Sequence, residues 1–121
     1  MIANANVIFD RLLADQKRHH AAPLSEGAQA NPIRELSADI ATLEERGITV
    51  VFFEMPMNPA LCEMPLQTSI RNLIRTQFPA EPYFRISDCN AVKTVDGVHL
   101  SRPEAEPVTQ QFVQIVREVI H

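Results

Sequence analysis

One apolar run closed by prolines constrains the fold of this chain more than any other feature. Residues Ile48–Phe53 are all β-branched or aromatic, and Pro56 and Pro59 follow them. A strand with apolar side chains on both faces has to be covered on both faces, as in the middle of a parallel sheet. The run therefore predicts an α/β fold in which helices pack on the two sides of a sheet.

Helical periodicity surrounds this strand. Asn31 and Pro32 are suited to begin a helix and Gly47 to end one, and between them apolar residues recur three or four positions apart. Four segments carry apolar residues at this helical spacing, which predicts an apolar face on each helix, and Pro107 is expected to kink the last helix or delay its start. We expect helices over Asn4–His20, Pro32–Arg46, Leu66–Gln77 and Ser101–Ile120, and a second strand over Tyr83–Ile86.

The order of these elements predicts an α/β layered sandwich. We divide the chain into an N-terminal helix and loop, residues 1–30, and an α/β core, residues 31–121. Only two strands are evident, so the core looks incomplete on its N-terminal side. An incomplete sheet exposes an edge, which predicts a homodimer or a complementing chain as partner.

Composition narrows the function classes. The 121 residues are 45% hydrophobic and 21% charged, as expected of one globular domain. A net charge of −4 without a basic cluster argues against nucleic-acid binding, and no apolar run approaches the roughly 20 residues of a membrane span. No signal peptide is visible, so the cytoplasm is the default location and the compartment stays open. Cys62 and Cys89 are accordingly expected as reduced thiols.

The motif with most chemical content is Asp96–Ser101, just before the last predicted helix. Asp96 stands three residues before His99, and Gly97 permits a tight turn between them. A carboxylate so placed can accept a hydrogen bond from the imidazole Nδ1–H, which leaves Nε2 to take a proton from a nucleophile. In the alternative interpretation, Asp96 only caps the turn and His99 is a half-buried packing residue.

This motif, with Ala105, resembles the last block of the SGNH (GDSL-type) hydrolases and acyltransferases, roughly Asp-Gly-x-His-Leu-Ser/Thr-x-x-Gly-Ala. Glu104 stands where that family usually has glycine. The likeness extends from about Pro32 to the C-terminus, and residues 48–59 resemble the family's penultimate strand and pocket loop. It implies a flavodoxin-like, three-layer α/β/α sandwich and an acyl-ester substrate. It also implies His99 as general base, Asp96 as its orienting acid, and no cofactor.

The family's nucleophile block, Gly-Asp-Ser, is missing, as are its oxyanion glycine and its Gly-x-Asn-Asp block. No serine of this chain has that context, so no nucleophile is assigned; the serines are Ser25, Ser37, Ser69, Ser87 and Ser101. A piece of a longer enzyme and an inactive relative both fit the sequence. The alternative function is a non-catalytic α/β interaction or oligomerisation module.

Other candidate sites have weaker patterns. His19 and His20 lack the spacing of metal ligands, so we expect solvent-exposed histidines and no metal site. A Cys89–His99 catalytic pair is conceivable but has no local support. The residues after the first strand would line the mouth of a site or fill gaps in the core; they are Glu54, Met55, Met57 and Asn58.

Overall fold

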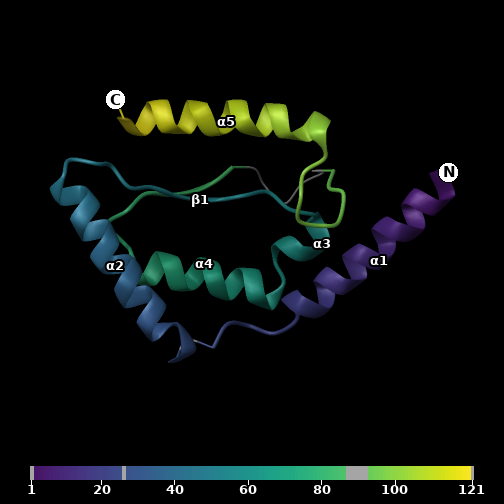
Figure 1. Ribbon diagram of the computed structural model, residues 1–121, viewed down its shortest axis with the longest axis horizontal. Coiled ribbons are helices and arrows are strands. Elements are labelled where there is room, and N and C mark those ends of the chain that lie inside the picture. The colour runs from purple at the N-terminus through teal and green to yellow at the C-terminus, as the bar shows by residue number, and fades with distance from the viewer. Residues whose placement is uncertain (1, 26, 87–92, 121) are drawn as a thin grey trace.

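The computed structural model describes residues 2–25, 27–86 and 93–120 and shows a mixed α/β fold (Figure 1). Five α-helices, one 3₁₀ turn and two short strands occur in the described part of the chain. In chain order they are α1 (Ile2–His20), η1 (Gly27–Gln29), α2 (Ala30–Glu45), β1 (Phe52–Glu54), α3 (Pro59–Cys62), α4 (Pro65–Gln77), β2 (Tyr83–Arg85) and α5 (Arg102–Ile120).

The predicted helices are confirmed, with differences at their starts. Helix α2 begins at Ala30, and the expected capping role of Asn31 is wrong, because Asn31 lies inside the helix and accepts a hydrogen bond from Arg34. Gly47 ends α2 as expected: its φ is +80°, and the Gly47 N–H donates to the Glu44 carbonyl at 3.0 Å. Helix α5 continues through Pro107.

The two strands form a small parallel sheet in which Phe52 pairs with Tyr83 and Glu54 with Arg85. The predicted strand over residues 48–53 is reduced to β1, because only the residues opposite β2 have ladder partners. The ladder begins with the Phe52 N–H donating to the Pro82 carbonyl at 2.8 Å. The mixed α/β class is as predicted, but the described sheet is smaller than that of a full sandwich.

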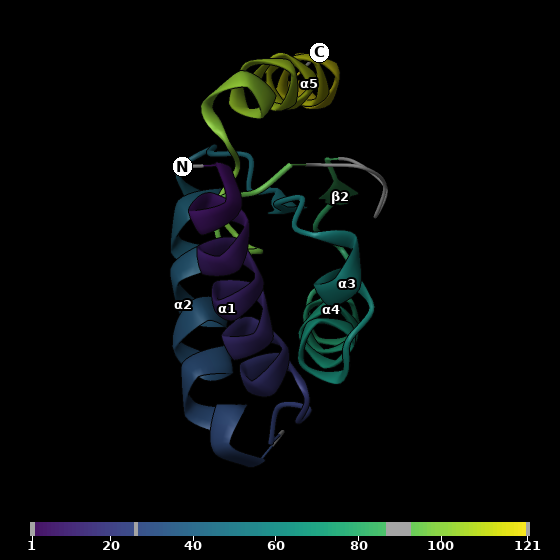
Figure 2. The same ribbon diagram turned by 90° about the vertical axis from the view of Figure 1, so that its right-hand side faces the viewer.

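Helices lie on both sides of this sheet, with α5 on one side and α4 on the other (Figures 1 and 2). Successive strand side chains point to opposite faces. Phe53 contacts Phe112 of α5, with ring centroids 4.7 Å apart, whereas Phe52 contacts Phe78 at the end of α4, at 5.2 Å. β1 therefore has an aromatic contact on each face, but its cover is incomplete. Phe53, on the α5 side, remains 43% exposed, so the predicted burial on both faces is wrong for that side.

Helix α1 is packed only along part of its length. It contacts α3 and α4, and the Leu24 N–H that follows it donates to Ser69 Oγ of α4 at 2.9 Å. Nearer the N-terminus, Val7 and Ile8 are 62% and 59% exposed. None of the helices in the described residues is long and apolar enough to cross a membrane.

Candidate functional site

A narrow hairpin between β2 and α5 carries the Asp96–Ser101 motif. Thr94 and Leu100 form an antiparallel bridge, and the Val95 N–H donates to the His99 carbonyl at 2.9 Å. The Ser101 N–H donates to the Lys93 carbonyl at 3.1 Å, just before α5 begins. These bonds place Asp96 and Gly97 at the tip of the hairpin.

Gly97 allows the tip of the hairpin to pack closely against helices α1 and α3. Its φ is +103°, a conformation that side chains other than glycine rarely adopt. A Cβ atom there would lie 3.0 Å from Leu61 Cδ1 of α3 and 3.1 Å from Leu13 Cδ1 of α1. The Asn58 N–H also donates to the Gly97 carbonyl at 2.8 Å. Both the turn and the close packing therefore require glycine at this position.

The Asp96 carboxylate binds the turn with one oxygen and the imidazole with the other. Oδ1 accepts hydrogen bonds from the backbone N–H groups of Val98 (3.0 Å) and His99 (2.8 Å). Oδ2 lies 2.5 Å from His99 Nδ1. Partial burial raises the pKa of Asp96, but the hydrogen bonds from His99 and Val98 outweigh it and hold this pKa below its ordinary value.

This geometry fixes the role of each imidazole nitrogen. An ionised carboxylate only accepts hydrogen bonds, so Nδ1 is the donor and the neutral ring carries its lone pair on Nε2. The His99 side chain is 75% exposed, and Nε2 has no hydrogen bond to any residue that the structure describes. The structure thus brings Asp96 and His99 together as expected, and the alternative of a half-buried packing His99 is wrong.

No hydroxyl group among the described residues is hydrogen-bonded to His99. Ser69 is engaged elsewhere, because its Oγ donates to the Leu66 carbonyl at 2.8 Å in α4. Ser37 lies in α2, and Ser87 lies outside the described residues. The structure therefore adds no nucleophile to the Asp96–His99 pair.

The weaker candidates differ from expectation in two places. Nδ1 of His19 and of His20 each lies 2.8 Å from the carbonyl one turn back in α1, but His20 is only 8% exposed, so the expected exposure is wrong for it. No group of three metal-ligating side chains occurs in the described ranges. Cys62 is disulfide-bonded, so a reduced thiol is wrong there, whereas Cys89 lies outside the described residues.

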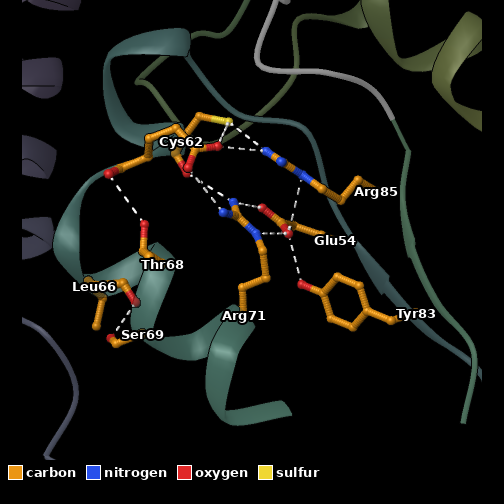
Figure 3. A network of polar contacts seen from close by, with 9 residues as sticks. Glu54, Cys62, Leu66, Thr68, Ser69, Arg71, Tyr83 and Arg85 are labelled. Carbon is orange, nitrogen blue, oxygen red and sulfur yellow. Dashed lines mark hydrogen bonds and ion pairs between the residues drawn. The ribbon is translucent and has the colours of Figure 1, made fainter. Parts of the chain in front are cut away.

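A buried ion pair between Glu54 of β1 and Arg71 of α4 was not foreseen from the sequence (Figure 3). Arg71 donates from Nε and Nη2 to the two carboxylate oxygens of Glu54, at 2.9 and 2.7 Å, and the Tyr83 hydroxyl donates to Oε2 at 2.8 Å. The side chains of Arg71 and Glu54 are 9% and 7% exposed. Gln67 and Arg71 are thus the buried residues of α4, where an apolar face was expected.

Hydrogen bonds outweigh burial in setting the pKa of Glu54. Burial raises the pKa of Glu54, but the hydrogen bonds from Arg71 and Tyr83 overcome it and leave this pKa at about 2. Burial, together with the nearby Glu54 carboxylate, raises the pKa of Tyr83 to about 12. Both partners of the ion pair are therefore charged at neutral pH. A sequence signal existed: Glu54 directly follows a buried strand, where an unpaired charge is costly.

Two cavities of about 390 Å³ each lie on other parts of the surface. The first lies between the start of α2 and the end of α4, and the second is lined by residues around Gly47 and Pro82. Neither is lined by Asp96 or His99. The Asp96–His99 pair, called the dyad below, therefore lies on an open surface rather than inside either cavity.

Comparisons with known proteins found no relative of this chain. No family model matches the sequence, and no curated protein or solved structure matches it either. Function has to be inferred from the geometry of the chain itself.

Proposed function

We propose that this chain supplies the acid–base half of an ester hydrolase or acyltransferase site of the SGNH type. His99 is the general base and Asp96 orients it. The observation that supports this most directly is the 2.5 Å contact between Asp96 Oδ2 and His99 Nδ1, combined with an exposed Nε2. The nucleophilic hydroxyl comes from outside these 121 residues, on a longer polypeptide or a complementing chain.

In this proposal, Nε2 accepts the proton of the hydroxyl as its oxygen forms a bond to the ester carbonyl carbon. The tetrahedral intermediate then expels the alcohol, to which the imidazolium returns the proton. Water, or an acceptor alcohol, attacks the acyl ester by the same sequence and releases an acid or a new ester. Asp96 stabilises the imidazolium and keeps the ring in the reactive tautomer.

The proposal extends to the architecture. We infer that α5, the sheet and α4 belong to a three-layer, flavodoxin-like α/β/α sandwich whose parallel sheet continues beyond β1. The aromatic contacts of Phe52 and Phe53 with helices on opposite faces support this, because a strand with apolar side chains on both faces is typical of a sheet interior. The carboxyl ends of parallel strands meet at one edge, where active-site groups of open α/β sheets gather.

The test compares His99→Ala with His19→Ala in short-chain p-nitrophenyl ester turnover, using the chain together with its copurifying proteins. His19 is a matched control because it is exposed and its Nδ1 is also hydrogen-bonded. Turnover should fall roughly 10²–10⁴-fold in His99→Ala, the usual contribution of a general base, and stay unchanged in His19→Ala. Equal turnover in wild type and His99→Ala would reject the proposal.

Fluorophosphonate labelling locates the nucleophile in the same samples. We expect the label on a serine outside this chain, and we expect labelling to depend on His99. A label on one of this chain's own five serines would instead place the nucleophile within it.

The exposed apolar side chains of α1 favour a second candidate, a non-catalytic oligomerisation module. Val7 and Ile8 are both more than half exposed on a helix that contacts the rest of the chain further along. Sedimentation of the wild type should then show a homodimer that Ile8→Lys dissociates. A compact wild-type monomer would reject this candidate.

A further inference from the structure

We propose that Arg71 is a positioning residue for the Asp96–His99 pair and acts on it through helix α3. Its importance for catalysis rests on the function proposed above. Its physical content, the orientation of the His99 ring, is measurable without any catalytic activity.

The first link connects Arg71 with α3. Besides both oxygens of Glu54, Arg71 reaches the carbonyl oxygen of Cys62, the last residue of α3, from Nη2 at 3.1 Å. It also donates from Nη1 to Glu63 Oε2, at 3.2 Å, at the C-cap of that helix. Figure 3 shows the Arg71 guanidinium lying between Glu54 of β1 and the end of α3. One buried cation therefore ties α4 to β1 and to α3.

The second link connects α3 with the hairpin that carries the dyad. Asn58 begins α3, because its Oδ1 accepts a hydrogen bond from the Ala60 N–H at 2.9 Å, and its own N–H donates to the Gly97 carbonyl. Leu61, which is fully buried, lies directly under Gly97. Gly97 is the neighbour of Asp96, so a displacement of α3 moves the carboxylate that holds His99.

The size of α3 explains why such a tether is needed. A helix of four residues, Pro59–Cys62, is a single turn and has little stability of its own. An apolar pair in place of Glu54 and Arg71 could fill the same volume and stabilise the fold as well, because burying two charges is costly. The guanidinium, unlike an apolar side chain, directs several hydrogen bonds at fixed angles. The disulfide of Cys62 and the Arg85 contacts with Cys62 Sγ and Glu63 also hold the end of α3, and Arg71 ties this end to α4.

The decisive variant removes both charges at once, as Glu54→Gln with Arg71→Met. This double variant keeps side-chain size and leaves no buried charge unpaired, yet it removes the hydrogen bonds to Cys62 and Glu63. The readout is the ring tautomer of each histidine in ¹⁵N-labelled protein, measured by long-range ¹H–¹⁵N NMR. His19 and His20 serve as internal references, because their Nδ1 atoms contact carbonyl groups within α1.

Arg75→Met is the matched control. Arg75 lies one turn further along α4, with its guanidinium 4.7 Å from the Tyr83 ring centroid, and within the described part of the chain no hydrogen bond or ion pair joins it to α3. Arg71→Lys is the second variant. It keeps the charge, but one ammonium group cannot reproduce the forked contacts of the guanidinium.

In the double variant we expect the Nδ1–H to Nε2–H tautomer ratio of His99 to fall roughly 2- to 10-fold, the value of about one hydrogen bond. Arg71→Lys should give a smaller fall, and Arg75→Met none. A folded double variant with an unchanged His99 tautomer would overturn the proposal. Failure of both Arg71 variants to fold would also overturn it, since the pair would then determine the fold rather than position the site.

The outcomes separate this inference from the proposed function. A shifted tautomer in a protein whose ester turnover is independent of His99 would retain the positioning role and reject the catalysis. An unchanged tautomer alongside turnover that depends on His99 would do the reverse.

Discussion

Two carboxylates of this chain, Glu54 and Asp96, each bind a nitrogen-bearing side chain, but the first pair is buried and the second is at the surface. Glu54 and Arg71 are almost completely buried, and the guanidinium makes four hydrogen bonds. Asp96 is 21% exposed and its partner His99 75%, and Nε2 of that ring has no partner among the described residues. In the first pair every polar side-chain atom is hydrogen-bonded within the protein, whereas in the second pair the Nε2 atom of the imidazole is left accessible to molecules outside it.

Breaking the buried pair should have the largest effect. Arg71→Met leaves the buried Glu54 carboxylate with only the more distant cation of Arg85, whose Nε lies 3.7 Å from Oε2. We expect a loss of about 3–5 kcal/mol in the free energy of unfolding, measured by urea denaturation. The double variant with Glu54→Gln should recover most of this loss. A single variant as stable as the wild type would show that water reaches Glu54.

Acid should weaken the buried pair in a defined range. The pKa of Glu54 is about 2 in the folded protein against an ordinary value of 4.5. Because the folded-state pKa is the lower one, its contribution to stability is complete above about pH 4.5 and is lost as the pH falls towards 2. Urea denaturation across this range should show a steeper decline in the wild type than in the double variant. Equal slopes would contradict the assignment.

Substitution of Gly97, at the tip of the hairpin, should have an intermediate effect on the free energy of unfolding. Gly97→Ala combines a positive φ with contacts of 3.0–3.1 Å to two leucine methyl groups, and we expect a cost of about 1–3 kcal/mol in the free energy of unfolding. Gly27→Ala is the control, because nothing lies within 4 Å of a Cβ there. It should change stability by less than about 0.5 kcal/mol. Similar losses of stability at both glycines would contradict a specific requirement for glycine at position 97.

The exposed pair should give the smallest effect on stability. We expect His99→Ala to change the free energy of unfolding by less than about 0.5 kcal/mol, because its side chain is largely in solvent. The measurement is thermal or urea unfolding beside Arg71→Met. A loss comparable with that of Arg71→Met would place His99 in the core of the fold instead of at its exposed surface.

Local features of this molecule were predictable from its sequence, and contacts between distant segments were not. The Asp96–His99 contact spans three residues and depends on one turn, so residue types and spacing were enough. Glu54 and Arg71 are 17 positions apart, and charged residues on a helix are usually solvated. Only the packing of α4 against β1 reveals that Arg71 faces inward.

The strands show the same limit. The apolar run of residues 48–53 predicted a strand covered on both faces. Phe52 and Phe53 do make aromatic contacts on opposite faces, but Phe53 remains 43% exposed. Its length depended on β2, which pairs with three residues, and no property of the run itself states how long its neighbour is. Likewise, the spacing within α1 predicted an apolar face but not that Val7 and Ile8 would be left exposed.

Asn58 provides the molecule with a built-in reporter. Its main-chain N–H is held by the Gly97 carbonyl, while its side chain starts α3. That amide can exchange with deuterated solvent only when the hairpin separates from α3, so its exchange rate measures how often the Asp96–His99 turn opens. The exchange rate of this single amide thus measures the local opening of the hairpin.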